Sequence, residues 1–243
     1  NAPLIYAAIS AKCSDDGQLR LSKSKIAAFE HCPKRLWLQV HRRGEGHFEE
    51  DTLRRFAFGH AVGERACEQI PDGIMVEAIP DIEAAIDRTR DLLATQPPVP
   101  IFEATFQHQD VLVRVDILQP DGQGGWIAIE VKATSRVRDY HLSDLATQIW
   151  VMRGCGVRIS SAYIRHVAGR INWTNLDASI ICFRDSNVTR MIKAFIAGRQ
   201  DIVEQARVIV RSEQPGIATG IHCLRPLSCE FQQFCKSRGT NPT

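Results

Sequence analysis

The sequence lacks the long apolar run that a membrane-spanning helix requires. Nowhere in the 243 residues do consecutive apolar residues approach the length of about 18 that indicates such a helix. The opening segment, NAPLIYAAIS, has no basic region and is too short for a secretory signal peptide. We therefore expect no membrane association and, by default, a cytoplasmic location.

The chain also has little net charge. Its 30 Lys and Arg residues against 28 Asp and Glu leave a formal charge of +2, which is too small to argue for any class of partner. The distribution is more informative, because basic residues gather in the first quarter of the chain: Lys23, Lys25, Lys34, Arg35, Arg42, Arg43, Arg54 and Arg55. Such a group is typical of a phosphate-binding face or, equally, of solvated helix surfaces.

The eight cysteines lack the regular spacing of a secreted disulfide framework. Four of them, Cys13, Cys67, Cys155 and Cys182, are isolated in the sequence and are expected to be plain thiols. The other four need a separate explanation.

These other four cysteines predict a metal site. Cys32 lies in FEHCPKRLWL, and the remaining three lie in HCLRPLSCEFQQFC, at Cys223, Cys229 and Cys235. Four thiolates bind either zinc or a [4Fe–4S] cluster, and either group would tie the two ends of the chain together. The gaps between the tail cysteines are wider than the CxxC of zinc ribbons and favour the iron–sulfur cluster. Zinc remains the alternative metal, and His222 an alternative ligand.

The periodicity of apolar residues changes along the chain from helical to strand-like and back. We expect helices over 22–43 with a kink at Pro33, 49–70 with interruptions at Gly59 and Gly63, 81–94, 141–156 and 187–213, and strands over 101–107, 110–118, 126–132, 160–167 and 169–176. This order predicts an α/β fold in which helices flank a small mixed sheet. We expect a single domain over 20–236, with a helical part at 20–95, a sheet core at 100–176, and a C-terminal helix and cysteine tail at 187–236.

Two carboxylates and a lysine are expected to converge within this sheet. Glu130 and Lys132, in IEVK, lie two residues apart on one strand and therefore face the same side. Asp116 ends the preceding strand, and an antiparallel return through 119–125 brings it beside Glu130. Because neighbouring carboxylates repel, we expect Mg²⁺ or Mn²⁺ to be bound by both of them and by the Val131 carbonyl oxygen. Such an ion activates water, and Lys132 can hold that water or neutralise the transition state.

The segments LSKSKIAAFEHCPKRLWL, VRVDIL and IEVK, together with Gln148 and the tail cysteines, resemble the iron–sulfur RecB-like nucleases of the PD-(D/E)XK superfamily. That group includes the CRISPR-associated RecB-type exonucleases and the AddB nuclease domain. The resemblance covers 20–236 and implies a restriction-endonuclease-like core, a structural [4Fe–4S] cluster, and metal-dependent hydrolysis of DNA that is single-stranded or has free ends. It gives catalytic positions to Asp116, Glu130 and Lys132, the glutamine of a QxxxY motif to Gln148, and the cluster positions to Cys32, Cys223, Cys229 and Cys235.

Two positions depart from the pattern of that family. Met152 stands where the QxxxY motif has its tyrosine, and Gly63 stands where relatives carry a metal-binding histidine. His60 or Glu64 can substitute for that histidine, and without a substitute we expect weak metal binding. Glu103, on the strand before that of Asp116, either faces the metal or is an exposed hairpin acid.

Three functions therefore compete. The first is a metal-dependent DNA nuclease. The second is a nucleic-acid-binding or assembly module of the same fold, catalytically weak or inactive, with protein partners in a CRISPR, repair or phage-defence complex. The third is a zinc-bound protein-interaction domain. For Glu130 and Lys132 taken alone, a salt bridge at the end of a strand is the alternative interpretation.

Overall fold

The computed structural model of the protein describes residues 20–77, 81–171 and 177–238. These residues divide into two compact units. The sheet unit contains the described residues up to Lys23 together with Phe58–Ile196, and the helical unit contains Ser24–Ala57 together with the described residues from Ala197 onward. Each unit therefore combines segments that are far apart in the sequence.

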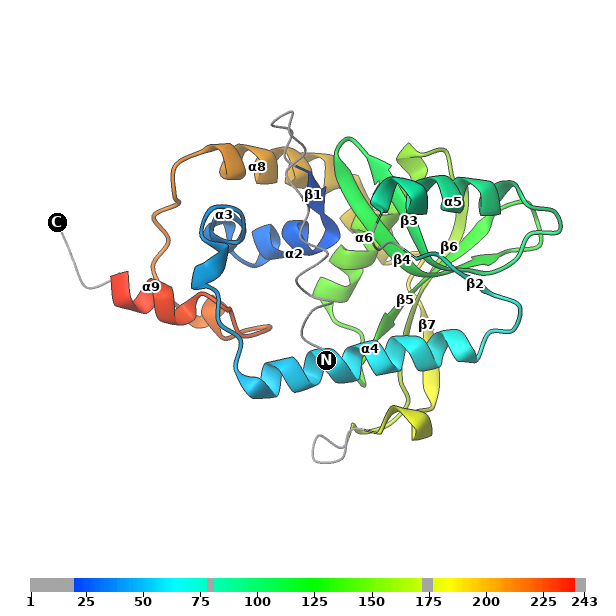
Figure 1. Ribbon diagram of the computed structural model, residues 1–243, viewed down its shortest axis with the longest axis horizontal. Helices are drawn as coiled ribbons and strands as arrows, with labels where there is room; N and C mark the ends of the chain where they lie inside the picture. Colours follow the sequence, from blue (N-terminus) through cyan, green and yellow to red (C-terminus); the bar gives the residue numbers. More distant parts are fainter. Residues whose placement is uncertain (1–19, 78–80, 172–176, 239–243) are drawn as a thin grey trace. The chain divides into compact units, whose positions relative to one another are not determined.

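A mixed sheet forms the centre of the sheet unit (Figure 1). Within the described part of the chain it has seven strands: β1 (Leu21–Ser22), β2 (Ile74–Met75), β3 (Ile101–His108), β4 (Val111–Pro120), β5 (Trp126–Lys132), β6 (Ile159–Val167) and β7 (Phe183–Asn187). Their order is β2-β3-β4-β5-β6-β7, and β1 pairs in parallel with β4. The predicted α/β fold with a mixed sheet flanked by helices is confirmed.

Tight turns make β3, β4 and β5 consecutive antiparallel partners. Gln109 and Asp110 join β3 to β4 with φ of 46° and 55°, the positive values that a two-residue hairpin turn of this kind requires. In the next loop, Asp121 Oδ1 accepts the backbone N–H groups of Gln123 and Gly125, at 2.7 and 2.8 Å. The first turn sets the register of β3 with β4, and the second turn sets the register of β4 with β5.

The helices of the sheet unit are α4 (Glu50–Glu68) from Phe58 onward, α5 (Ile82–Ala94), α6 (Asp139–Gly154), the 3-10 turn η2 (Ala178–Ile180) and α7 (Ile192–Ala197). On one side of the sheet, Ile117 and Ile129 pack with Ala66 of α4 in a buried cluster. Strand residues alternate between faces, so Glu130 projects from the other side, where Gln148 of α6 contacts it. None of the helices in the described residues combines the length and the apolar character needed to cross a membrane.

The helical unit consists of α2 (Lys23–His31) from Ser24 onward, α3 (Pro33–His41), η1 (Arg43–Glu45), the first part of α4, α8 (Arg199–Arg211), η3 (Ile221–Cys223) and α9 (Gln232–Arg238). Pro33 separates α2 from α3, as predicted, because proline disfavours a helical conformation in the residue before it and fits the first position of a helix. Cys32 is accordingly extended, with φ −165° and ψ 118°.

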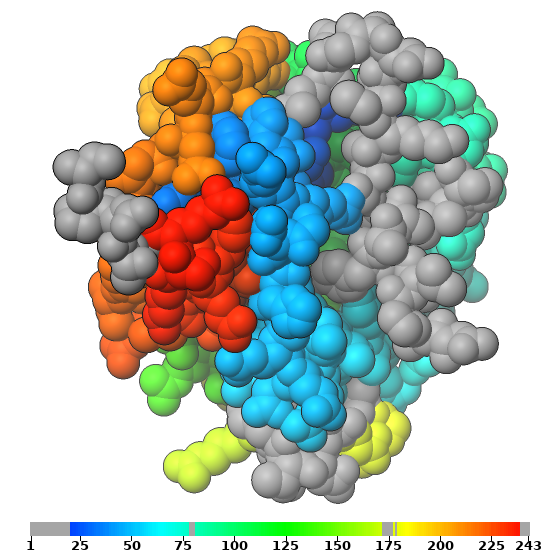
Figure 2. All heavy atoms as spheres, turned by 60° about the vertical axis from the view of Figure 1, so that its left-hand side comes forward, coloured from blue at the N-terminus to red at the C-terminus, as the bar shows by residue number. Residues whose placement is uncertain are grey.

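Segments from early and late in the described chain pack together within the helical unit. Leu38 of α3 packs with Phe231 and Phe234 of the C-terminal segment. Figure 2 shows this segment (red) lying alongside the N-terminal helices (blue). Ion pairs support the same contact: Arg35 Nε lies 2.8 Å from Glu230 Oε2. The cysteines of the two segments are thereby brought into one unit.

Two helical predictions were wrong in detail. α4 is continuous through Gly59 and Gly63, because its buried stripe of Phe58, Val62 and Ala66 outweighs the cost of about 1 kcal/mol for each glycine. The single helix predicted over 187–213 is instead two helices, α7 and α8, which are separated at Gly198.

One strand prediction was also misplaced. Of the strand expected over 169–176, residues 172–176 lie outside the described residues, and 169–171 are not in a strand. The strand that pairs with β6 is β7, at Phe183–Asn187. Its sequence, FRDSN, is too polar to give a strand-like apolar pattern, and the Arg165–Asp185 ion pair across the two strands helps to hold it.

Candidate functional site

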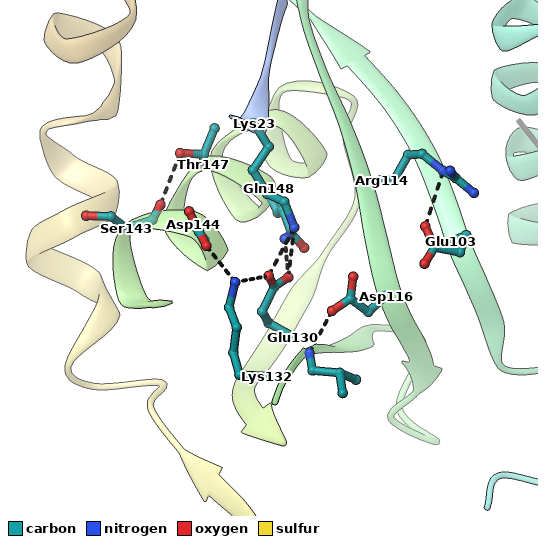
Figure 3. Close-up of polar contacts among 11 residues, drawn as sticks. Lys23, Glu103, Arg114, Asp116, Glu130, Lys132, Ser143, Asp144, Thr147 and Gln148 are labelled. Atoms are coloured by element: carbon teal, nitrogen blue, oxygen red, sulfur yellow. Dashed lines mark hydrogen bonds and ion pairs between the residues drawn. The ribbon is translucent and has the colours of Figure 1, made fainter. Parts of the chain in front are cut away.

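The neighbouring strands β4 and β5 bring Asp116 beside Glu130. Asp116 lies within β4 and not at its end as predicted, because the strand continues to Pro120. The β4–β5 ladder ends with Ile117 opposite Ile129, and one antiparallel step further places Asp116 opposite Glu130. The ladder stops there, and the backbone N–H of Val131 donates to Asp116 Oδ2 at 2.7 Å (Figure 3). Val131 thus contacts the aspartate through its N–H, while the predicted role of its carbonyl oxygen as a metal ligand stays a prediction.

Glu130 is the centre of the site, with a residue exposure of only 2%. Three donors surround its carboxylate (Figure 3). Lys23 Nζ lies 3.0 Å from Oε1 and 3.2 Å from Oε2, Lys132 Nζ lies 2.8 Å from Oε1, and Gln148 Nε2 donates to Oε2. Burial alone raises the pKa of Glu130, but the charges of Lys132 and Lys23 outweigh burial and hold that pKa below its ordinary value.

Lys132 is held between two carboxylates. Its ammonium lies 2.8 Å from Glu130 Oε1 and 2.6 Å from Asp144 Oδ2. Burial lowers the pKa of Lys132, but the charges of Glu130 and Asp144 overcome burial and raise the pKa above its ordinary value. Lys132 is therefore a charged, fixed donor rather than a proton acceptor at neutral pH.

Asp116 differs from Glu130 in its electrostatic surroundings. Burial and, next, the charge of Glu130 raise the pKa of Asp116, while the charge of Lys23 and the hydrogen bond from Val131 oppose the rise. It is therefore unfavourable for both carboxyl groups to be ionised at the same time. A divalent cation between them would remove this repulsion.

Gln148 contributes an acceptor without a partner. The residue is fully buried on α6, and its Nε2 donates to Glu130. Its Oε1 is buried and has no hydrogen-bond partner among the described residues. An orphaned acceptor beside a carboxylate pair is suited to a bound water or to a hydrated cation.

Sequence reasoning did not assign Lys23 and Asp144 to this site. Asp144 lies one helical turn before Gln148 on α6, and this spacing of four residues was a signal that could have found it. Lys23 lies 107 residues from Glu130 and was grouped with the basic residues of the first quarter, so no local pattern pointed to it.

Several basic residues of the first quarter of the chain contact other parts of the protein. Arg35 pairs with Glu230, and Lys34 Nζ donates to the backbone carbonyl of Ile217 at 3.1 Å. Arg42 and Arg43 are exposed. The predicted phosphate-binding face therefore cannot include the whole group.

The two residues proposed to replace a metal-binding histidine, His60 and Glu64, are both exposed on α4. A Cβ atom built on Gly63 would meet nothing within 4 Å. Glu103 lies across from Asp116 in the β3–β4 ladder, between the pairs Phe102–Ile117 and Ala104–Val115. It pairs with Arg114 at 3.2 Å, and its charge helps to raise the pKa of Asp116.

The donor set of the carboxylate site fits Mg²⁺ or Mn²⁺. No group of three His, Cys, Asp or Glu side chains with metal-site geometry occurs in the described ranges. Mg²⁺ commonly binds one or two carboxylates and keeps several waters, so two carboxylates with a neighbouring amide oxygen are sufficient for it. Asp116, Glu130 and the Gln148 acceptor provide that set.

A second candidate site lies in the helical unit, where one pocket is lined by four cysteines. They are Cys32, Cys223, Cys229 and Cys235. The pocket also has apolar walls, Leu38 and Phe231, and two basic side chains, Lys34 and Arg35. The structure thus gathers the four cysteines that the sequence singled out, while Cys67, Cys155 and Cys182 are free thiols elsewhere.

Protonated thiols are favoured in this pocket without a metal. Burial raises the pKa of Cys229 to about 11, and it raises that of Cys235 as well.

His222 also lines the pocket, and its backbone carbonyl accepts a hydrogen bond from His31 Nε2 at 2.5 Å.

Comparison with known proteins gives little further information. No protein-family model matches the chain, and no curated protein matches it. A solved structure titled "Crystal structure of SSO0001" is similar over 95% of this chain and 91% of that chain, with 10% sequence identity and a TM-score of 0.43. A similarity at this TM-score carries no argument about function, so the interpretation depends on the two sites themselves.

Proposed function

We propose that this protein is a metal-dependent nuclease that hydrolyses phosphodiester bonds in DNA, on single strands or at free ends. The observation that carries the proposal is the convergence of Asp116, Glu130 and Lys132 on the neighbouring strands β4 and β5, with Gln148 in contact from α6. The resemblance of the same residues to the PD-(D/E)XK nucleases supplies the reaction and the substrate class.

Each side chain has a defined part in this proposal. Asp116 and Glu130 would hold Mg²⁺ or Mn²⁺, which when bound lowers the pKa of water and neutralises charge on a phosphoryl oxygen. Lys132, fixed by Asp144 at 2.6 Å, is placed to orient the attacking water or to stabilise the charge that develops on phosphorus-bound oxygens. Gln148 fixes the rotamer of Glu130.

The cysteine pocket supports a structural [4Fe–4S] cluster as the second part of the proposal. Four thiols around one pocket match the ligand set of the cluster, and the neighbouring Lys34 and Arg35 suit its thiolate ligands. Zinc, which also takes four thiolates, is the alternative occupant.

Degradation of labelled single-stranded DNA tests the catalytic part. We expect the anaerobically purified protein to degrade the DNA with Mn²⁺ and not with excess chelator. The variant Lys132→Met should lose at least about 100-fold in rate, because one charged donor at a phosphoryl centre contributes on this order. Lys193→Met, at an exposed position on α7, is the matched control and should retain full activity.

A binding or assembly module without turnover is the second candidate. Two observations favour it: Gly63 stands in the place of the family histidine, and Met152 is fully buried in the place of the tyrosine. DNA binding without metal-dependent degradation, unchanged in Lys132→Met, would support this candidate over the nuclease. Partners in a CRISPR, repair or phage-defence complex stay predictions under either function.

A further inference from the structure

Both oxygens of the Glu130 carboxylate are contacted by side-chain donors. Both of its oxygens face Lys23 Nζ, at 3.0 and 3.2 Å, so one ammonium spans the edge of the carboxylate that a cation would approach. The remaining contacts come from Lys132 on Oε1 and Gln148 on Oε2. A cation that binds Glu130 must therefore replace one of these three donors.

Lys23 is the donor that can leave. Lys132 has a second partner, Asp144, which holds its ammonium at 2.6 Å. Gln148 is fully buried, so its amide cannot move into solvent. The Lys23 side chain is 24% exposed, more than the 19% of Lys132, and the contacts of its ammonium shown by the structure are both with Glu130.

The position of Lys23 is built into the sheet. β1 pairs in parallel with β4, with Leu21 opposite Val111 and Ser22 opposite Leu112. β4 pairs with β5 further along the same strand, from Ile117 onward. Lys23 is the next residue after β1 and so follows the direction of β4 towards Asp116. The backbone pairing thus delivers its side chain into the space between β1 and β5, beside Glu130.

We propose that Lys23 is a built-in competitor of the divalent cation. Its ammonium neutralises the Glu130–Asp116 pair in the metal-free protein and withdraws from Glu130 when a cation binds. This inference rests on the proposed function of the same carboxylates. It assigns Lys23 a role that sets metal affinity, separate from the roles of Lys132 and Gln148.

Calorimetric titration of the folded full chain with Mn²⁺ tests the inference without an activity measurement. We expect Lys23→Met to bind Mn²⁺ about tenfold or more tightly than the wild type, because the cation no longer has to break the ion pair. Lys23→Arg retains the charge and should bind as the wild type does. Lys193→Met, at an exposed position where water screens the charge, is the matched control and should leave the affinity unchanged.

Thermal unfolding gives a second readout of the same competition. In chelator, Lys23→Met should melt below the wild type, because the carboxylate pair loses its counter-charge. Mn²⁺ should then raise the melting temperature of Lys23→Met more than that of the wild type. If Lys23→Met does not fold, Lys23→Gln, which keeps hydrogen-bond donors, replaces it in both measurements.

The outcomes separate this inference from the proposed function. Equal or weaker Mn²⁺ binding by Lys23→Met, with clear binding by the wild type, would overturn the competition and leave the nuclease proposal intact. Absence of Mn²⁺ binding in the wild type and in Lys23→Met alike would overturn both. Binding that survives Glu130→Gln in the Lys23→Met background would show that the ion sits elsewhere, which also overturns the competition.

Discussion

At the scale of single residues, Asp116 is held in surroundings that oppose its charge. Burial and the neighbouring Glu130 both raise its pKa. A carboxyl group whose pKa is higher in the folded state than in the unfolded chain costs no stability at low pH. Its cost appears as the pH rises above the unfolded value of about 4 and is complete above the folded value. The proposed role of Asp116 as a metal ligand therefore costs folding stability at neutral pH.

This conflict predicts that Asp116→Asn stabilises the metal-free protein. An asparagine oxygen can still accept the N–H of Val131 but carries no charge. In chelator, we expect Asp116→Asn to unfold with a free energy about 1–2 kcal/mol greater than the wild type at neutral pH, and with an equal free energy near pH 4. Urea denaturation at the two pH values measures this. A stabilisation that does not vary with pH would contradict the electrostatic origin.

At the scale of elements, sequence reasoning was strongest where one short pattern decides the structure. Pro33 predicted the boundary between α2 and α3, and alternating apolar residues predicted β3, β4 and β5. Glu130 and Lys132 point to the same side of the sheet because alternate residues of a strand share one face. The two-residue strands β1 and β2 are too short to give any pattern, and β7 is too polar.

The candidate site was predictable to the same extent. Asp116, Glu130 and Lys132 lie on neighbouring strands joined by one short loop, so local spacing brings them together. Lys23 reaches Glu130 only because β1 pairs with β4, and no periodicity in the sequence indicates that pairing. The two residues that the sequence did not assign to the site depend on structure beyond local spacing. Lys23 depends on the pairing of distant strands, and Asp144 depends on which face α6 turns to the sheet.

The short C-terminal elements η3 and α9 carry cysteines of the pocket, so a substitution in α9 tests the proposed cluster. Cys235 of α9 lines the pocket with Cys32 at the boundary of α2 and α3. We expect Cys235→Ser to lower the iron content of anaerobically purified protein from about four atoms per chain to less than half of that, and to lower the melting temperature. Iron analysis and calorimetry measure the two effects.

Cys182→Ser is the control for the cysteine substitution. Cys182 is an exposed thiol of the sheet unit. It should leave both the iron content and the melting temperature unchanged. If the wild type instead contains about one zinc atom per chain, and Cys235→Ser loses this zinc, the four cysteines bind zinc and not an iron–sulfur cluster.

At the scale of the whole molecule, each candidate site is contained within one unit. The carboxylate site draws on β4, β5, α6 and the residue after β1, all in the sheet unit. The cysteine pocket draws only on the helical unit. Along the sequence, Lys23 is the last residue of the sheet unit before the chain enters the helical unit at Ser24.

The central claim is that Asp116 and Glu130 jointly bind a divalent cation. Anomalous diffraction from crystals grown with Mn²⁺ tests it most directly. We expect one strong peak within about 2.5 Å of a carboxylate oxygen of each residue, with Lys23 Nζ withdrawn from Glu130 and Lys132 still held by Asp144. A structure at saturating Mn²⁺ in which Lys23 remains on Glu130 and no peak touches either carboxylate would contradict the metal centre and, with it, the nuclease.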